Sequence, residues 1–174
     1  MQTAQINVRA ANPSDHAAIV EFNLQLAAET EDKTLDRERL SCGVAALLAD
    51  RAKGRYFVAE VDGTVVGQMM HTGEWSDWRN GMLWWLGSVY VTPEHRGCGV
   101  FRRLFEHVLA LAQADPTVVG LRLYIDQDNS AARQVYARMG LGPAGYDVLE
   151  RMWDDERAPV HNDSSPTPAE PPGS

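Results

Sequence analysis

One stretch of the chain limits its possible folds more than any other. It is the almost wholly apolar run Met82–Val91, which is followed by a glycine-containing turn and then by an amphipathic segment. A run of this length and character predicts a central β-strand that is covered on both faces. Pro93 ends the strand, and two adjacent rows of apolar residues then predict a helix over Gly99–Ala114 with one inward face. This succession of strand, turn and helix favours an α/β fold.

The remaining patterns add further strands and helices to this unit. Asp62-Gly63 is a strong hairpin signal, whereas the polar and aromatic stretch Thr72–Gly81 is predicted to be a loop. The predicted order is βααβββαβαβ, a mixed α/β sheet flanked by helices. Strands are predicted over Gln5–Ala10, Arg55–Val61, Thr64–Met70, Met82–Val91, Leu121–Ile125 and Tyr146–Trp153, and helices over Asn12–Ala28, Asp36–Arg51, Gly99–Ala114 and Asn129–Met139.

The composition changes sharply near the end of the chain. Five of the nine prolines lie in the last 20 of the 174 residues, among serine, threonine and aspartate. A segment of this kind buries too little apolar area to fold alone. We therefore predict one domain over residues 1–153 and a flexible tail over residues 154–174.

Charge and cysteine content argue against several classes of protein. A formal net charge of −8 is unlike the basic surface that broad nucleic-acid binding requires. Cys42 and Cys98 offer no disulfide framework, and the five histidines show no metal-ligand spacing, so no metal is expected. No run approaches the ~20 apolar residues of a membrane span, and the first residues lack the pattern of a signal peptide. We expect a cytoplasmic protein that binds neither nucleic acid nor membrane.

The turn between the central strand and its helix has the chemistry of an anion site. Gly97 and Gly99 lack side chains, so a ligand can approach the backbone closely. The first N–H groups of the following helix have no partner within it and lie at its positive end. These features suit a pyrophosphate. A plain helix entry is the alternative, and neither the Walker sequence nor the third glycine of the Rossmann fingerprint is present.

Val89–Leu104 resembles the acetyl-CoA-binding motif of the GNAT superfamily of N-acetyltransferases, Arg/Gln-x-x-Gly-x-Gly/Ala after a β-strand. Phe101 departs from it, since Gly or Ala is usual there. The element order also resembles this family over residues 5–153, which implies a mostly antiparallel central sheet. In the family this strand separates from its neighbour and pairs with the pantetheine arm. The coenzyme-binding positions that we infer from the motif and its surroundings are Val89, Tyr90, Val91, Arg96, Gly97, Cys98, Gly99, Val100, Phe101, Arg102, Asn129 and Arg133.

A second segment, Asn129–Leu141, resembles the family pattern Asn-x-x-Ala-x-x-x-Tyr-x-x-x-Gly-Phe, with Leu141 in place of Phe. Asn129 is well placed to cap a helix. Tyr136 lies two turns further along the same side. The resemblance implies that this tyrosine protonates the departing CoA thiolate, a general-acid role. The alternative is that Tyr136 is only a core aromatic.

The acceptor side is less clearly marked in the sequence. An amine with a pKa near ~10.4 must lose a proton before it attacks a thioester. Some family members carry a glutamate for this on the central strand, where this chain has Trp85. Glu74 is therefore our first candidate base and His71 the second. The substrate-binding candidates are Glu29, His71, Trp75 and Trp84. The alternative for the tryptophans is that they only pack in a hairpin tip, and the alternative for Glu29 is that it lies at a solvated helix end.

The resemblance implies an enzyme that moves an acetyl group from acetyl-CoA to a primary amine by direct attack. We favour a small-molecule acceptor because the aromatic and acidic residues suit a compact pocket. Three alternatives stay open: a protein or peptide acceptor, a non-catalytic acyl-CoA-binding regulatory module, and another donor such as succinyl-CoA. A route through an acetylated Cys98 is conceivable, but phosphate is expected in that turn. Closing strands in this family often form dimers, so a homodimer is a further option.

Overall fold

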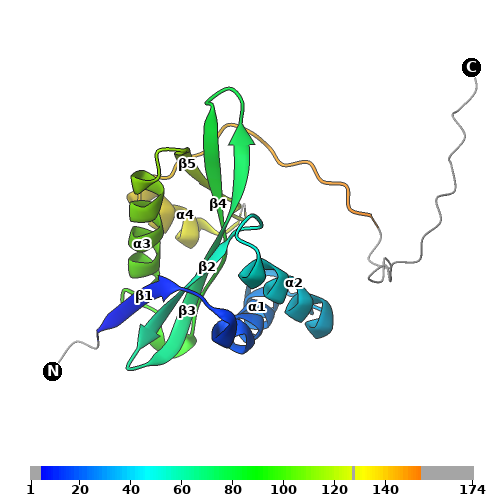
Figure 1. The fold of residues 1–174 in the computed structure, drawn as a ribbon, viewed down its shortest axis with the longest axis vertical. Helices are drawn as coiled ribbons and strands as arrows, with labels where there is room; N and C mark the ends of the chain where they lie inside the picture. The colour runs from blue at the N-terminus through cyan, green and yellow to red at the C-terminus, as the bar shows by residue number, and fades with distance from the viewer. Residues whose placement is uncertain (1–4, 127, 154–174) are drawn as a thin grey trace, which may run out of the picture.

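The computed structural model describes residues 5–126 and 128–153, and Figure 1 shows their arrangement. A sheet in the order β1-β2-β3-β4-β5 forms the centre of the molecule. The first four strands pair antiparallel, and β5 pairs parallel to β4. The strands are β1 (Ile6–Ala10), β2 (Arg55–Val61), β3 (Thr64–Ser76), β4 (Gly81–Val91) and β5 (Val118–Leu123). The mixed, mostly antiparallel α/β sheet that we expected is confirmed.

Helices cover both faces of this sheet. Helix α1 (His16–Glu31) and helix α2 (Arg37–Ala49) lie on one face, and α3 (Val100–Ala114) and α4 (Ser130–Arg138) lie on the other (Figure 1). Short 3-10 helices, η1 (Pro13–Asp15) and η2 (Pro93–His95), precede α1 and α3. We refer below to the α1 face and the α3 face.

Two apolar clusters fix the helices to the sheet. On the α3 face, Phe57 and Met69 of the sheet pack with Leu104 and Phe105 of α3. On the α1 face, Tyr56 and Val58 pack with Ile19, Val20 and Val44. Because Tyr56, Phe57 and Val58 alternate between clusters, the strand is buried on both sides. This burial explains the nearly unbroken apolar runs of the sequence.

The predicted loop at Thr72–Gly81 was wrong. Strand β3 continues to Ser76 and pairs with β4 from His71↔Leu86 to Ser76↔Gly81, so a long hairpin replaces the loop. The turn occupies residues 77–80, where Asn80 adopts φ +49°. The polar residues that suggested a loop lie on an uncovered part of the sheet, where a strand tolerates them.

The predicted closing strand over Tyr146–Trp153 was also wrong. The structure places this segment outside any helix or strand, with its large apolar side chains exposed. The sheet therefore has β5 at its edge, and the order among the described residues is βααβββαβα. Strand β5 starts at Val118, three residues before the predicted start. The predicted tail, residues 154–174, lies outside the described residues.

Across residues 5–126 and 128–153, no helix combines the length and the apolar character needed to cross a membrane.

Candidate functional site

Strand β4 changes its pairing near its carboxyl end. Its register with β5 stops at Leu86↔Leu123, whereas its pairing with β3 continues to Gly67↔Val91. From Gly87 onward, the β5 side of β4 has no strand partner in the described part of the chain. Backbone groups on such an open edge can pair with a ligand in extended form.

A β-bulge lies at the start of this open edge. Between the pairs Met70↔Gly87 and Gln68↔Tyr90, one residue of β3 faces two residues of β4. One of the two, Ser88, adopts φ +47°, an unusual conformation for a residue other than glycine. Bulges bend a strand and redirect its groups. Here the bulge turns β4 away from β5 where the two strands separate.

The glycine turn lies directly beyond the open edge. Gly97 (φ +72°) and Gly99 (φ +88°) adopt left-handed conformations, and a Cβ atom at either would meet no atom within 4 Å. The first helical bond of α3 runs from the Arg103 N–H to the Gly99 carbonyl, so the amides of the three residues between them have no helical acceptor. These amides, at the positive end of a helix beside open space, suit an anion such as a pyrophosphate.

Arg96 does not point freely into this space. Its Nε donates to the Val91 carbonyl at 2.8 Å, and its Nη2 donates to Glu29 Oε2 of α1 at 2.6 Å. The guanidinium lies 5.4 Å from the centre of the Tyr90 ring. Glu29, predicted to touch the substrate, is thus bonded to the glycine turn. Beside this guanidinium the pKa of the Glu29 carboxyl falls below its usual value.

Tyr136 of α4 lies beside the first turn of α3. Its ring meets the Phe101 ring edge-on, with centroids 5.6 Å apart. The side chain is half-buried, and burial raises the pKa of its phenol. The phenol therefore stays protonated at neutral pH and can donate a proton. Asn129 caps α4 as expected, since its side chain accepts the Ala132 N–H at 2.9 Å.

The α1 face of the long hairpin carries a polar and aromatic cluster. The Glu74 carboxylate accepts from Trp85 Nε1 at 2.5 Å and from Arg122 Nη1 at 3.2 Å. The Trp85 ring stacks on Tyr124 at 4.4 Å, and the Arg122 guanidinium lies 5.7 Å from the Trp85 ring centre. Arg122 and Tyr124 are not among the residues predicted from the sequence, although strand alternation places them on the opposite face from the apolar Leu121 and Leu123.

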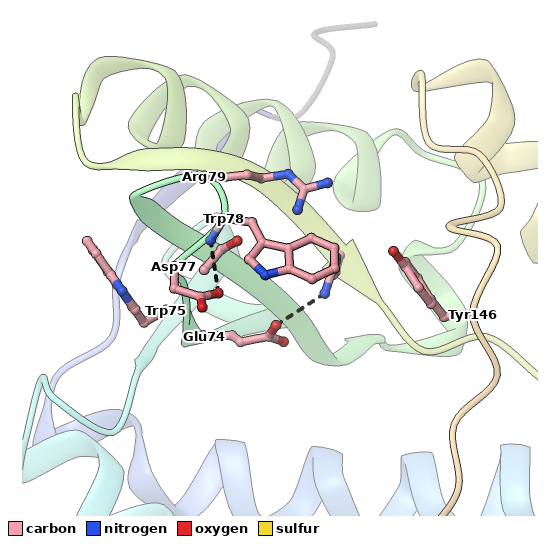
Figure 2. A pocket seen from close by; sticks show the side chains of 8 residues that line it. Glu74, Trp75, Asp77, Trp78, Arg79 and Tyr146 are labelled. Atoms are coloured by element: carbon pink, nitrogen blue, oxygen red, sulfur yellow. Dashed lines mark hydrogen bonds and ion pairs between the residues drawn. The ribbon is translucent and has the colours of Figure 1, made fainter.

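An open cavity of about 260 Å³ adjoins this cluster at the hairpin tip. Figure 2 shows Glu74 with its ion-pair partner on one side and Tyr146, from the segment after α4, facing the hairpin. Trp75 and Trp78 are largely exposed. The lining mixes two carboxylates, two guanidiniums and three aromatic rings, from Glu74, Trp75, Ser76, Asp77, Trp78, Arg79, Arg122 and Tyr146.

His71 and Trp84 lie on the opposite face from Glu74. Their rings stack at 3.8 Å, and His71 also lies against Phe57 in the α3-face cluster. Burial, aided by the charge of Arg55, lowers the pKa of His71 to about 4. The structure therefore separates the two candidate bases by the thickness of the sheet.

The other predicted residues surround the turn at varying distance. Val89 and Val91 turn their side chains into the α3-face cluster, which leaves their backbone at the open edge. Arg102 pairs with Glu106 along α3 at 2.7 Å, and Arg133 is exposed on α4. Cys98 is exposed, with its thiol near the Arg96 carbonyl. No cluster of three or more potential metal ligands occurs among the residues that the structure describes.

Comparison with known proteins gives a consistent result. A sequence model described as the acetyltransferase (GNAT) family matches residues 20–141. The chain is 38% identical to a mycothiol acetyltransferase of Streptomyces griseus in an alignment 105 residues long that covers 55% of this chain and 30% of that protein. The chain thus spans less than a third of the length of that curated relative.

Solved structures agree with the sequence match. A possible acetyltransferase from Clostridium difficile 630 is 42% identical, with a TM-score of 0.81 over 86% of this chain and 98% of that one. A predicted acetyltransferase from Clostridium acetobutylicum, solved with acetyl-CoA, is 18% identical, with a TM-score of 0.71 over 84% of this chain and 96% of that one. This second likeness is one of fold.

Proposed function

Because the chain belongs to the GNAT family of acetyltransferases, we propose that it transfers an acetyl group from acetyl-CoA to a primary amine by direct attack. One observation carries the proposal: the open edge of β4 leads into the Gly97–Gly99 turn, with Tyr136 beside it. The pantetheine arm suits the open edge, the pyrophosphate at one end of this arm suits the turn, and the thioester sulfur at its other end needs an acid such as Tyr136. A non-catalytic coenzyme-binding module would not need an acid at Tyr136.

The residues present fit the coenzyme. The backbone of Val89 and Val91 would pair with its pantetheine arm, and the amides of the Gly97–Gly99 turn and of Val100 and Phe101 would hold its pyrophosphate. Arg102 and Arg133 are both exposed and would contact the remaining phosphate, Arg102 by exchanging its bond with Glu106. The coenzyme supplies an activated acetyl thioester. The protein's part is to orient it and to donate a proton from Tyr136 to the sulfur.

The acceptor is proposed to lie on the α1 face, along Glu74, Trp85, Arg122 and Tyr124. Aromatic faces and a carboxylate attract a cationic amine. The Glu74 carboxylate is bonded to Trp85, three residues before Ser88 and thus about 10 Å from the bulge along the strand. Proton transfer from an amine at the bulge to Glu74 would therefore pass through water. His71 is not retained as a base, since it lies on the other face.

Glu74→Gln is expected to lower kcat/KM about 100-fold at pH 7, which is at the lower end of what a general base contributes. The deficit should shrink as pH rises toward the amine's own pKa of ~10, where the amine no longer needs a base. Thiol release measured from pH 7 to 9.5 tests this. Asp50→Asn is the control, because its side chain is similarly exposed (45% against 44%) and also paired with a basic side chain, that of Lys53. A deficit that is constant with pH would assign Glu74 to acceptor binding instead.

A first experiment tests the proposed function itself. Calorimetric titration with acetyl-CoA, followed by thiol release with small amines, amino acids and peptides, separates the candidate functions. We expect binding and turnover of a small amine, an expectation that the relative named mycothiol acetyltransferase also supports. Binding without turnover of any acceptor would favour a regulatory module, and turnover of peptides alone would favour a protein acetyltransferase.

We place the reaction in the cytoplasm, as the sequence predicts.

We also propose a homodimer. Strand β5 is an edge strand with open backbone groups, and the nearby segment 146–153 exposes Leu149 to 95% together with Tyr146, Met152 and Trp153. In a two-fold symmetric dimer, segment 146–153 of each copy would pair with β5 of the other copy. Both edge strands and both apolar segments would then be covered.

Leu149→Glu is therefore expected to convert a dimer into a monomer, as measured by light scattering at about 50 μM protein, where micromolar affinity suffices. The introduced charge would have to be buried in the pairing surface. Trp78→Glu is the control, since this side chain is 85% exposed but lies at the hairpin tip. A monomeric wild-type protein would contradict the proposal.

A further inference from the structure

The glycine turn is tied to helix α1 through a single arginine. Arg96 directly precedes Gly97, and its guanidinium bonds the Val91 carbonyl on one side and the Glu29 carboxylate on the other. Glu29 lies in the last turns of α1, 67 residues earlier in the chain. The bond therefore joins the turn to an element on the α1 face.

A buried tyrosine contacts both members of the Arg96–Glu29 pair. Tyr90 is 4% exposed, and its single hydroxyl hydrogen is shared between Gln25 Oε1 at 2.6 Å and Glu29 Oε1 at 3.0 Å. Arg96 lies over its ring. Both oxygens of the Glu29 carboxylate are thus engaged, one by Tyr90 and one by Arg96. These two bonds tie Glu29 to β4 and to the residue that precedes the turn.

The turn needs such a support because its glycines are conformationally free. Gly97 and Gly99 populate many backbone conformations in the absence of restraint, and ordering them on binding costs entropy. A turn that is held in its binding shape beforehand avoids part of this cost. Arg96 can fix the turn from its amino end, while α3 fixes it from the other.

We propose that Glu29 is a positioning residue that acts through Arg96 to hold the glycine turn in its coenzyme-binding shape. In this arrangement Arg96 supports the turn and the phosphates are held by backbone amides. Since α1 borders the proposed acceptor face, the pair also links the two halves of the site. The inference rests on the proposed function, because it concerns the same turn.

The test measures the Kd of CoA by calorimetry for wild type, Glu29→Ala and Glu29→Gln. We expect Glu29→Ala to weaken binding about three- to tenfold, as expected for a charged hydrogen bond that is partly screened by solvent. Asp50→Ala is the control: its carboxylate is similarly exposed (45% against 38%) and pairs with Lys53, but it lies directly after α2 and outside the contacts of Glu29, Tyr90 and Arg96. The control should bind CoA like wild type, and melting temperatures should show that all variants are folded.

A double-mutant cycle separates positioning from a general structural role. If Glu29 acts through Arg96, the double variant Glu29→Ala with Arg96→Ala should bind CoA no more weakly than Arg96→Ala alone. Additive losses would overturn the proposal, and so would tighter binding by Glu29→Ala, which would identify Arg96 as a phosphate ligand restrained by Glu29. Normal binding by Glu29→Ala and Glu29→Gln would overturn this inference alone. Absence of CoA binding by the wild type would overturn the proposed function together with it.

Discussion

Tyr136→Phe is expected to lower kcat about 100-fold while the Kd of acetyl-CoA stays within about twofold. The substitution removes only the hydroxyl that we propose protonates the leaving thiolate. The ring remains, and with it the edge-on contact with Phe101 at 5.6 Å that holds α4 against the start of α3. Coenzyme binding and stability should therefore change little. Steady-state assays of thiol release measure kcat, and calorimetry measures the Kd of acetyl-CoA.

The pH dependence of the wild type gives a second check on the same residue. Burial raises the pKa of Tyr136 above the ordinary value of 10, so the phenol keeps its proton at all pH values below that. Activity should therefore not decline through loss of this proton between pH 7 and pH 9.5. A group whose acid form is needed fails only above its pKa, so any alkaline limb from Tyr136 lies above pH 10.

Thr117→Val is the control for this experiment, because it also removes one hydroxyl but at an exposed position after α3, at the end of that helix opposite to the glycine turn. It should leave kcat within about twofold, the range of ordinary surface substitutions. An unchanged kcat for Tyr136→Phe would remove the acid role. A large loss of coenzyme affinity instead would show that the hydroxyl contributes to binding.

Local patterns in the sequence were sufficient for the centre of this fold. The apolar run of β4, the glycine turn and the stripe of α3 are each fixed by neighbours within the same segment, and the structure has all three. The segment beyond Met70 was predicted to be a loop and is a strand, whereas the segment 146–153 was predicted to be a strand and is not one. Both depend on pairing with another strand, which local propensity does not determine.

The same distinction holds for the candidate site. The turn conformation at Gly97 and Gly99 and the helix cap at Asn129 could be predicted, because each follows from residues within its own segment. His71 and Glu74 could not be separated, because a loop has no alternating faces. Once β3 is known to continue, their spacing of three places them on opposite faces. The bond from Glu29 to Arg96 spans 67 residues and has no local signature.

Gly99→Glu is expected to weaken CoA binding on the order of 100-fold or more, enough to be undetectable by calorimetry. Gly99 is the N-cap of α3 with φ +88°, and a side chain there would extend into the open space beside the unpaired amides. A carboxylate in this place would occupy the anion site and repel the phosphates. Isolated protein should still fold, since a negative charge at a helix N-terminus is itself stabilising.

Two variants separate the charge from the backbone strain. Gly99→Ala introduces only the strain of a left-handed alanine, about 1–2 kcal/mol, and should bind CoA more weakly than wild type but far better than Gly99→Glu. Gly63→Glu places the same side chain at a similar φ, +77°, again with no atom within 4 Å of the Cβ, but in the β2–β3 turn. It should lose some stability and keep full CoA affinity. If Gly99→Glu bound CoA normally, the pyrophosphate would have to lie elsewhere, and the assignment of the turn would fail even though the fold and family stand.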